Sequence, residues 1–72
     1  MSVYKVIDII GTSPVSWEQA ATEAVERARA SVDDIRVARV MEQDMSVDAA
    51  GKITFPIKLE VSFKMRPPHP KP

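Results

Sequence analysis

The sequence predicts an α+β fold in which one strand, one helix and two further strands follow each other along the chain. Residues 3–10 are rich in Val, Ile and Tyr and end at Gly11, as a strand does. Small apolar residues then recur at helical intervals between positions 17 and 32. Residues 52–64 alternate apolar and polar side chains, which is the period of a half-buried strand.

The join between the first strand and the helix carries the clearest local signal. Gly11 lets the chain leave the strand, and Pro14 keeps Ser13 out of the helical region. The Ser16 hydroxyl is placed to accept from the amide of Gln19, whose side chain can reach back to the Ser16 amide. This capping box predicts that the helix begins at Ser16.

The apolar stripe of the predicted helix consists mainly of alanine. Its members are Trp17, Ala20, Ala21, Ala24, Val25, Ala28 and Val32. Small side chains let the helix axis lie close to the sheet that it covers, so we expect a tight helix-on-sheet layer. Asp33 and Asp34 end the helix.

The second and third strands differ in how their faces are composed. The second strand, predicted at residues 36–47, has apolar groups on both faces, and a turn at 48–51 leads into the third strand at 52–64. One face of the third strand is wholly apolar, and its members are Ile53, Phe55, Ile57, Leu59, Val61 and Phe63. Pro56, on the other face, cannot donate to a ladder, which predicts a sheet edge or a local bulge. Since one short helix covers only one face of a sheet, the two-faced second strand predicts a homo-oligomer.

Length and composition narrow the class of protein. A chain of 72 residues forms one domain with a small core, and without cysteine it has neither disulfides nor thiolate metal sites. Its formal net charge of zero argues against a nucleic-acid partner. The apolar runs are too short to cross a membrane and no secretory leader pattern is present, so we expect a cytoplasmic protein without a membrane partner. Residues 1–65 are predicted to form the domain, and residues 66–72 a flexible Pro-rich tail.

The chain offers few groups for catalysis. Its one histidine, His69, lies in the Pro-rich tail, where no activated nucleophile accompanies it. Ser13, Ser16 and Ser31 occupy turn or capping positions. We therefore expect that the protein is not an enzyme.

An acidic row lies in the second half of the predicted second strand. Glu42, Asp44, Ser46 and Asp48 alternate, so their oxygens project from one face. Carboxylate and hydroxyl oxygens suit a hard cation such as calcium, although one strand supplies only one or two of the six to eight ligands that calcium takes. Backbone carbonyls, waters or a second subunit must supply the rest, and the alternative interpretation of the row is a solvated acidic edge.

The segment Gly-Thr-Ser-Pro-x-Ser-Trp-Glu at residues 11–18 resembles the opening signature of the dodecins. The resemblance extends over residues 3–65 and includes Ala24, Val25, Arg27 and Ala28 in the helix, the stretch 40–43 and the closing residues 61–64. It implies a βαββ fold in which one helix packs on a three-stranded antiparallel sheet. It also implies a hollow homododecamer that handles a flavin.

Three positions depart from the flavin-binding pattern of that family. Val37 and Pro56 stand where flavin-binding members have a stacking tryptophan and a hydrogen-bonding glutamine, and Asp44 stands where some have an arginine that holds the ligand's phosphate. Valine has no aromatic face, proline has no side-chain donor or acceptor, and aspartate repels a phosphate. Lys64 alone keeps the basic character of the flavin pocket, while Trp17 belongs to the helix signature and is expected to pack as core.

These departures resemble the mycobacterial branch of the family, the calcium dodecins. The resemblance implies that calcium replaces the flavin, with Asp44 as the leading ligand and Glu42 and Asp48 as helpers. Two other functions stay open at this point. One is flavin storage in a rearranged pocket, and the other is an interaction role in protein export, in which the Pro-rich tail recruits a partner.

Overall fold

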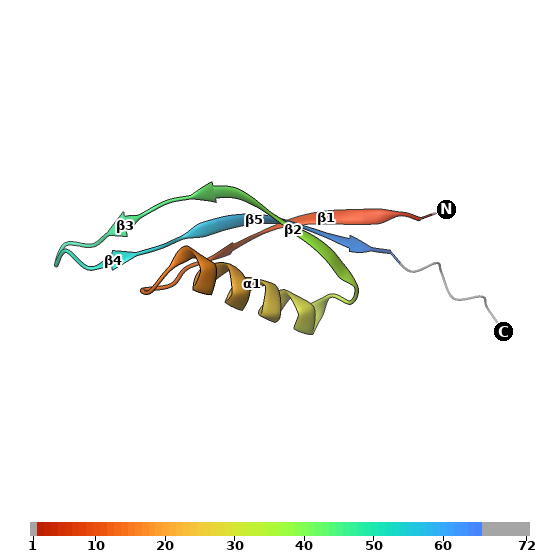
Figure 1. Cartoon of the computed structure of the whole chain (residues 1–72), viewed down its shortest axis with the longest axis horizontal. Coiled ribbons are helices and arrows are strands. Elements are labelled where there is room, and N and C mark those ends of the chain that lie inside the picture. Colours follow the sequence, from red (N-terminus) through yellow and green to blue (C-terminus); the bar gives the residue numbers. More distant parts are fainter. Residues whose placement is uncertain (1, 66–72) are drawn as a thin grey trace.

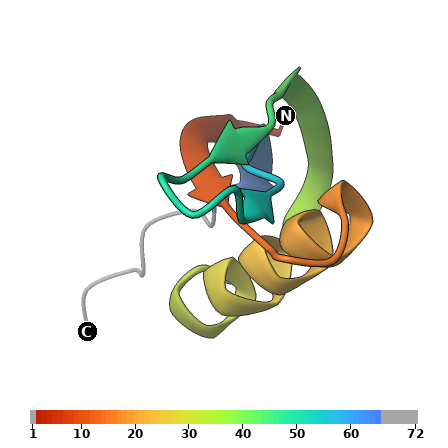
Figure 2. The same cartoon turned by 90° about the vertical axis from the view of Figure 1, so that its left-hand side faces the viewer.

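The computed structural model describes residues 2–65, and the predicted tail at 66–72 lies outside the described residues. The elements, in chain order, are β1 (Tyr4–Gly11), α1 (Trp17–Ser31), β2 (Ile35–Gln43), β3 (Ser46–Val47), β4 (Ile53–Thr54) and β5 (Ile57–Lys64). Strands β1, β5 and β2 form an antiparallel sheet in that order, and α1 packs on one of its faces (Figures 1 and 2). The expected fold, one helix on a three-stranded antiparallel sheet, is confirmed.

The second and third strands are each divided in two, which the alternation did not predict. β2 ends at Gln43 and β5 begins at Ile57, and the chain between them forms the separate two-stranded ribbon β3–β4. We call residues 44–56 the arm, which extends beyond the helix at one end of the molecule (Figure 1). Pro56 lies in no strand, so the expectation that it marks a sheet edge or a local bulge within the third strand is wrong. Pro56 instead lies in the break between β4 and β5, where no ladder bond requires its missing N–H.

The core lies between α1 and the alternating face of β5. Ile57, Leu59 and Val61 are buried there, together with Ala20 from the helix. Ala38 and Val40 of β2 pair with Val61 and Leu59 and lie on the same face of the sheet, whereas Val37 pairs with Ser62 on the open face. The prediction of apolar groups on both faces of the second strand is therefore confirmed.

Helix and sheet approach closely where β1 ends. A Cβ atom built at Gly11 would lie 2.6 Å from the carbonyl oxygen of Ala20 and 3.0 Å from the Cβ of Ala24. Both distances are shorter than ordinary van der Waals contact, so Gly11 is required for close packing as well as for leaving the strand. The tight layer predicted from the alanine stripe is confirmed at this point.

The helix begins as predicted, but its cap differs in one bond. The Ser16 hydroxyl accepts from the Gln19 amide at 3.0 Å. The Gln19 side chain does not return to Ser16; its Oε1 accepts instead from the hydroxyl of buried Ser13 at 2.6 Å. The same Ser13 oxygen accepts from the amides of Val15 at 3.0 Å and Ser16 at 3.4 Å. The Ser16 amide, which was expected to donate to the Gln19 side chain, thus donates to the Ser13 hydroxyl oxygen instead.

Four contacts, which we call the neck, close the base of the arm and tie it to the start of the helix. The Phe55 amide donates to the carbonyl of Ser13 at 2.8 Å, and the Asp44 amide donates to the carbonyl of Pro56 at 3.0 Å. The Trp17 indole N–H donates to the carbonyl of Asp44 at 2.9 Å. The Trp17 and Phe55 rings meet edge to face, with centroids 5.1 Å apart. Trp17 packs against the core, as expected, and also fixes the direction of the arm.

Gly11→Ala is expected to lower the free energy of unfolding by about 1–3 kcal/mol, because the added methyl group meets the helix backbone. Urea unfolding at one fixed protein concentration measures this. The matched control is Gly51→Asn, at a position with φ of +82° and open space around it, where the added side chain meets no atom and backbone strain alone gives a smaller loss, because asparagine visits this conformation more readily than most residues. Equal losses in the two variants would refute the close approach.

Trp17→Phe keeps an aromatic ring against Phe55 but removes the hydrogen bond to Asp44. We expect a loss of about 0.5–1.5 kcal/mol in the free energy of unfolding, and faster hydrogen exchange of the Asp44 amide. Phe55→Leu, which leaves the indole bond in place, serves as the control for the ring contact. Unchanged exchange at Asp44 in Trp17→Phe would show that the indole does not hold the arm.

Candidate functional site

The acidic row predicted as one face of a strand is distributed over three different settings. Glu42 lies in β2, where it pairs with Lys58. A register shift between Val40 and Glu42 precedes it and brings Glu42 to the open face of the sheet. Asp44 follows the end of β2 at the base of the arm, and Asp48 follows β3 at the tip.

Asp44 has a fixed backbone and an exposed side chain. Its N–H donates to Pro56 and its carbonyl accepts from the Trp17 indole, so the peptide groups on both sides of its Cα are held by the neck. Its carboxylate makes no hydrogen bond or ion pair with residues 2–65, and the residue is exposed. A carboxylate on a fixed backbone is a suitable oxygen ligand for a hard cation, because little conformational freedom is lost when it binds.

The turn predicted at residues 48–51 is present, and the Asp48 side chain holds it, a role that differs from the predicted one of a calcium ligand. One carboxylate oxygen, Oδ1, accepts from the amides of Ala50 and Lys52, each at 2.9 Å. The Asp48 carbonyl accepts from the amide of Gly51 at 2.9 Å, and Gly51 has positive φ. An aspartate followed three residues later by glycine is a typical turn signal, and this signal points to the role that Asp48 has here.

Within residues 2–65 of one chain, Glu42, Asp44 and Asp48 do not come together as a metal site. Among residues 2–65, no group of three or more His, Cys, Asp or Glu side chains lies close enough to hold an ion. Asp44 at the base of the arm and Asp48 at its tip are separated by the length of β3. Glu42 and Asp48 therefore do not complete a site with Asp44 inside one copy, and their part as helpers stays a prediction for an assembled form.

Of the three positions that the family resemblance assigns to a flavin pocket, Val37 and Lys64 lie near each other within one chain, whereas Pro56 lies far from both. Val37 pairs with Ser62 on the open face of the sheet, and Lys64 lies two residues further along the same face of β5. Pro56 lies six residues from Ser62 in the other direction, which is about 20 Å along an extended strand. A ligand that touches both Val37 and Pro56 would have to lie between different copies of the chain.

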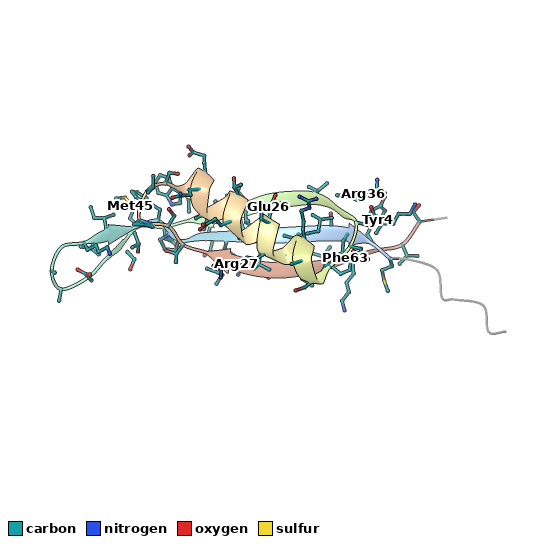
Figure 3. The ribbon with its side chains drawn as sticks, turned by 90° about the horizontal axis from the view of Figure 1, so that it is seen from below. Tyr4, Glu26, Arg27, Arg36, Met45 and Phe63 are labelled. Atoms are coloured by element: carbon teal, nitrogen blue, oxygen red, sulfur yellow. The ribbon has the colours of Figure 1, made fainter. Side chains whose placement is uncertain are left out.

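Exposed apolar side chains gather on two surfaces away from the helix. On the open face of the sheet they are Tyr4, Val6, Ile10 and Val37. On and beside the arm they are Met45, Val47 and Ile53. Figure 3 places Met45 at the arm end of the molecule and Tyr4 and Phe63 at the opposite end. Both ends of the molecule thus present apolar surface to their surroundings.

No helix within residues 2–65 is long and apolar enough to pass through a membrane.

Known proteins resemble this chain over almost its whole length. A family model described as Dodecin matches residues 3–66. Calcium dodecin of Mycobacterium tuberculosis is 83% identical over 71 residues, which cover 99% of this chain and 100% of that protein. A crystal structure of calcium dodecin from Mycobacterium tuberculosis, described as having a novel calcium-binding site, has a TM-score of 0.85 and covers 97% of this chain and 100% of its own.

More distant structures share the fold. A Thermus thermophilus dodecin variant is 29% identical with a TM-score of 0.86, covering 94% of this chain and 100% of its own. Dodecin from Streptomyces davaonensis, at 24% identity, matches the fold with a TM-score of 0.84 and covers 92% and 97% of the two chains. These solved structures share the fold described above, and the family model together with the 83% identical relative shows that the chain belongs to the dodecin family.

Proposed function

We propose that this protein is a non-catalytic, calcium-binding dodecin that assembles into a hollow homododecamer in the cytoplasm, without nucleic-acid or membrane partners. The observation that carries the proposal is the 83% identity, over 99% of the chain, to a protein named for calcium.

The small size of the core supports self-association. Four apolar residues are buried in the described chain, whereas twelve large apolar side chains are exposed. A chain of about 70 residues has little stability to spare, and association is a common remedy where disulfides are absent. Packing of further copies against the open face and the arm would provide the burial that α1 alone does not provide.

Asp44 is the proposed leading ligand for calcium. Its carboxylate is an exposed oxygen donor on a backbone that the neck holds, and Glu42 precedes it by two residues on the open face. Residues 2–65 of one chain do not bring three acidic groups together. Carbonyls, waters or residues of another copy would therefore complete the coordination. When bound, calcium would neutralise acidic side chains that otherwise repel one another.

A flavin is not the proposed ligand. Val37 offers no ring for stacking and Pro56 no side-chain hydrogen bond. The tryptophan of the chain is already engaged, because its indole N–H donates to Asp44 and its ring packs on Phe55.

Asp44→Asn is expected to weaken calcium binding about tenfold or more, because calcium affinity depends on the number of charged ligands. Isothermal titration calorimetry on protein treated with chelator measures the affinity, and native mass spectrometry checks that the oligomer persists. Asp8→Asn is the matched control, since Asp8 is an exposed aspartate on β1 outside the proposed site. Asp44→Asn with unchanged affinity would remove Asp44 from the site, and a wild-type protein that binds no calcium would refute the proposed function.

The purified protein is expected to leave riboflavin fluorescence unquenched and to show no absorption band of a bound flavin. The reason is that Val37, which lies on the open face of the sheet, offers no aromatic ring on which a flavin could stack. A fluorescence titration with riboflavin checks this. Saturable quenching would contradict the proposed change of ligand and favour a rearranged flavin pocket.

A further inference from the structure

The carbonyl of Asp44 lies where the ladder between β2 and β5 stops. The last pair of the register is Gln43 opposite Ile57. One further pair would set Asp44 opposite Pro56, and the Asp44 amide does donate to the Pro56 carbonyl at 3.0 Å. In an antiparallel pair of this kind the partner's amide returns a second hydrogen bond. Proline has no N–H, so Pro56 leaves the Asp44 carbonyl without that donor.

The indole of Trp17 supplies the missing donor. Its N–H donates to the Asp44 carbonyl at 2.9 Å, which is the usual length of a backbone hydrogen bond. Because the start of α1 lies beside the base of the arm (Figure 1), the indole reaches this carbonyl from the helix rather than from the sheet. A side chain of the helix thus completes a pair that a proline leaves with one bond.

The indole is itself held in place. Its ring packs against the core and meets the Phe55 ring edge to face, with centroids 5.1 Å apart. The bond to Asp44 is exposed, so water could also satisfy this carbonyl, but a mobile water would not fix the direction of the peptide group. What Trp17 contributes at this position is therefore order rather than the satisfaction of a buried polar atom.

Both peptide groups that flank the Cα of Asp44 are fixed in this way, one by Pro56 and the other by Trp17. The backbone sets the direction of the Cα–Cβ bond and the side-chain rotamers that are allowed. The carboxylate is exposed and makes no hydrogen bond or ion pair with residues 2–65, so it is presented to solvent from a defined direction. A cation that binds an ordered carboxylate pays a smaller entropic cost than one that must first order it.

We propose that Trp17 is a positioning residue for the calcium site. Its indole N–H takes the place of the amide that Pro56 lacks and holds the Asp44 carboxylate in the direction in which it binds the ion. This inference rests on the proposed function, in which Asp44 is the leading ligand. It adds a residue that acts on the ion only through Asp44.

Removal of the indole donor tests the inference. Trp17→Phe keeps a ring against Phe55 and is expected to weaken calcium binding about threefold to tenfold, because Asp44 must then be ordered by the ion. Isothermal titration calorimetry measures the affinity after native mass spectrometry has recorded the assembly. The chain has a single tryptophan, so benzothienylalanine, which has the shape of tryptophan without its N–H, can replace it at this position alone if Trp17→Phe does not fold.

Restoring an amide opposite Asp44 separates positioning from a general loss of stability. Trp17→Phe/Pro56→Ala has an N–H at residue 56 that can donate to the Asp44 carbonyl, and we expect it to recover most of the affinity that Trp17→Phe loses. The matched control is Ile7→Val, which removes one methyl group from the core opposite Val61 and leaves the neck intact. We expect its calcium affinity to stay within about twofold of the wild-type value.

Trp17→Phe with wild-type affinity would overturn the inference. An equal loss in Ile7→Val would also overturn it, because affinity would then follow stability alone. A double variant that recovers no affinity would show that the indole does not stand in for the amide of residue 56. Wild-type protein that binds no calcium refutes the proposed function and this inference with it, whereas calcium binding that is independent of Trp17 refutes the inference alone.

Discussion

The length of the one helix constrains the rest of the structure. α1 has 15 residues and is about 22 Å long, whereas the alternating row from residue 53 to residue 64 extends over about 40 Å. The helix therefore covers Ile57, Leu59 and Val61 closely and leaves Ile53 exposed. The alanine stripe and Gly11 bring this short cover as near to the sheet as backbone contact allows. The apolar surface that the helix leaves uncovered supports the proposed self-association.

The neck joins this constraint to the candidate site. Trp17, the first residue of α1, packs against the core at the end of the helix nearest the arm. Its indole N–H also donates to the carbonyl of Asp44. Trp17 thereby fixes both the direction of the arm and the backbone of Asp44, the proposed calcium ligand. A change in the packing of Phe55 against Trp17 is accordingly expected to affect assembly and ion binding together. The fold and the proposed calcium ligand thus depend on one small group of contacts.

The sequence predicted most of the fold because its patterns are local and periodic. The Ser16 cap, the alanine stripe and the alternation at Ile57, Leu59 and Val61 each follow from spacing alone. The break at Pro56 was visible as a residue without an N–H, but its position between strands depends on the pairing of β3 with β4. The Ser13 bond to Gln19 was missed because it depends on how the chain turns after β1.

The candidate site was less accessible to prediction. Alternation placed Glu42, Asp44 and Asp48 on one face, but the strand ends at Gln43 and the row is divided. Asp48 is occupied by the turn at the tip of the arm, and convergence of the others depends on copies that a single sequence does not position. Native mass spectrometry of the chain with and without calcium tests the proposed function most directly. We expect a dodecamer that carries calcium and no flavin, whereas a folded monomer that binds calcium without assembling would contradict the proposal.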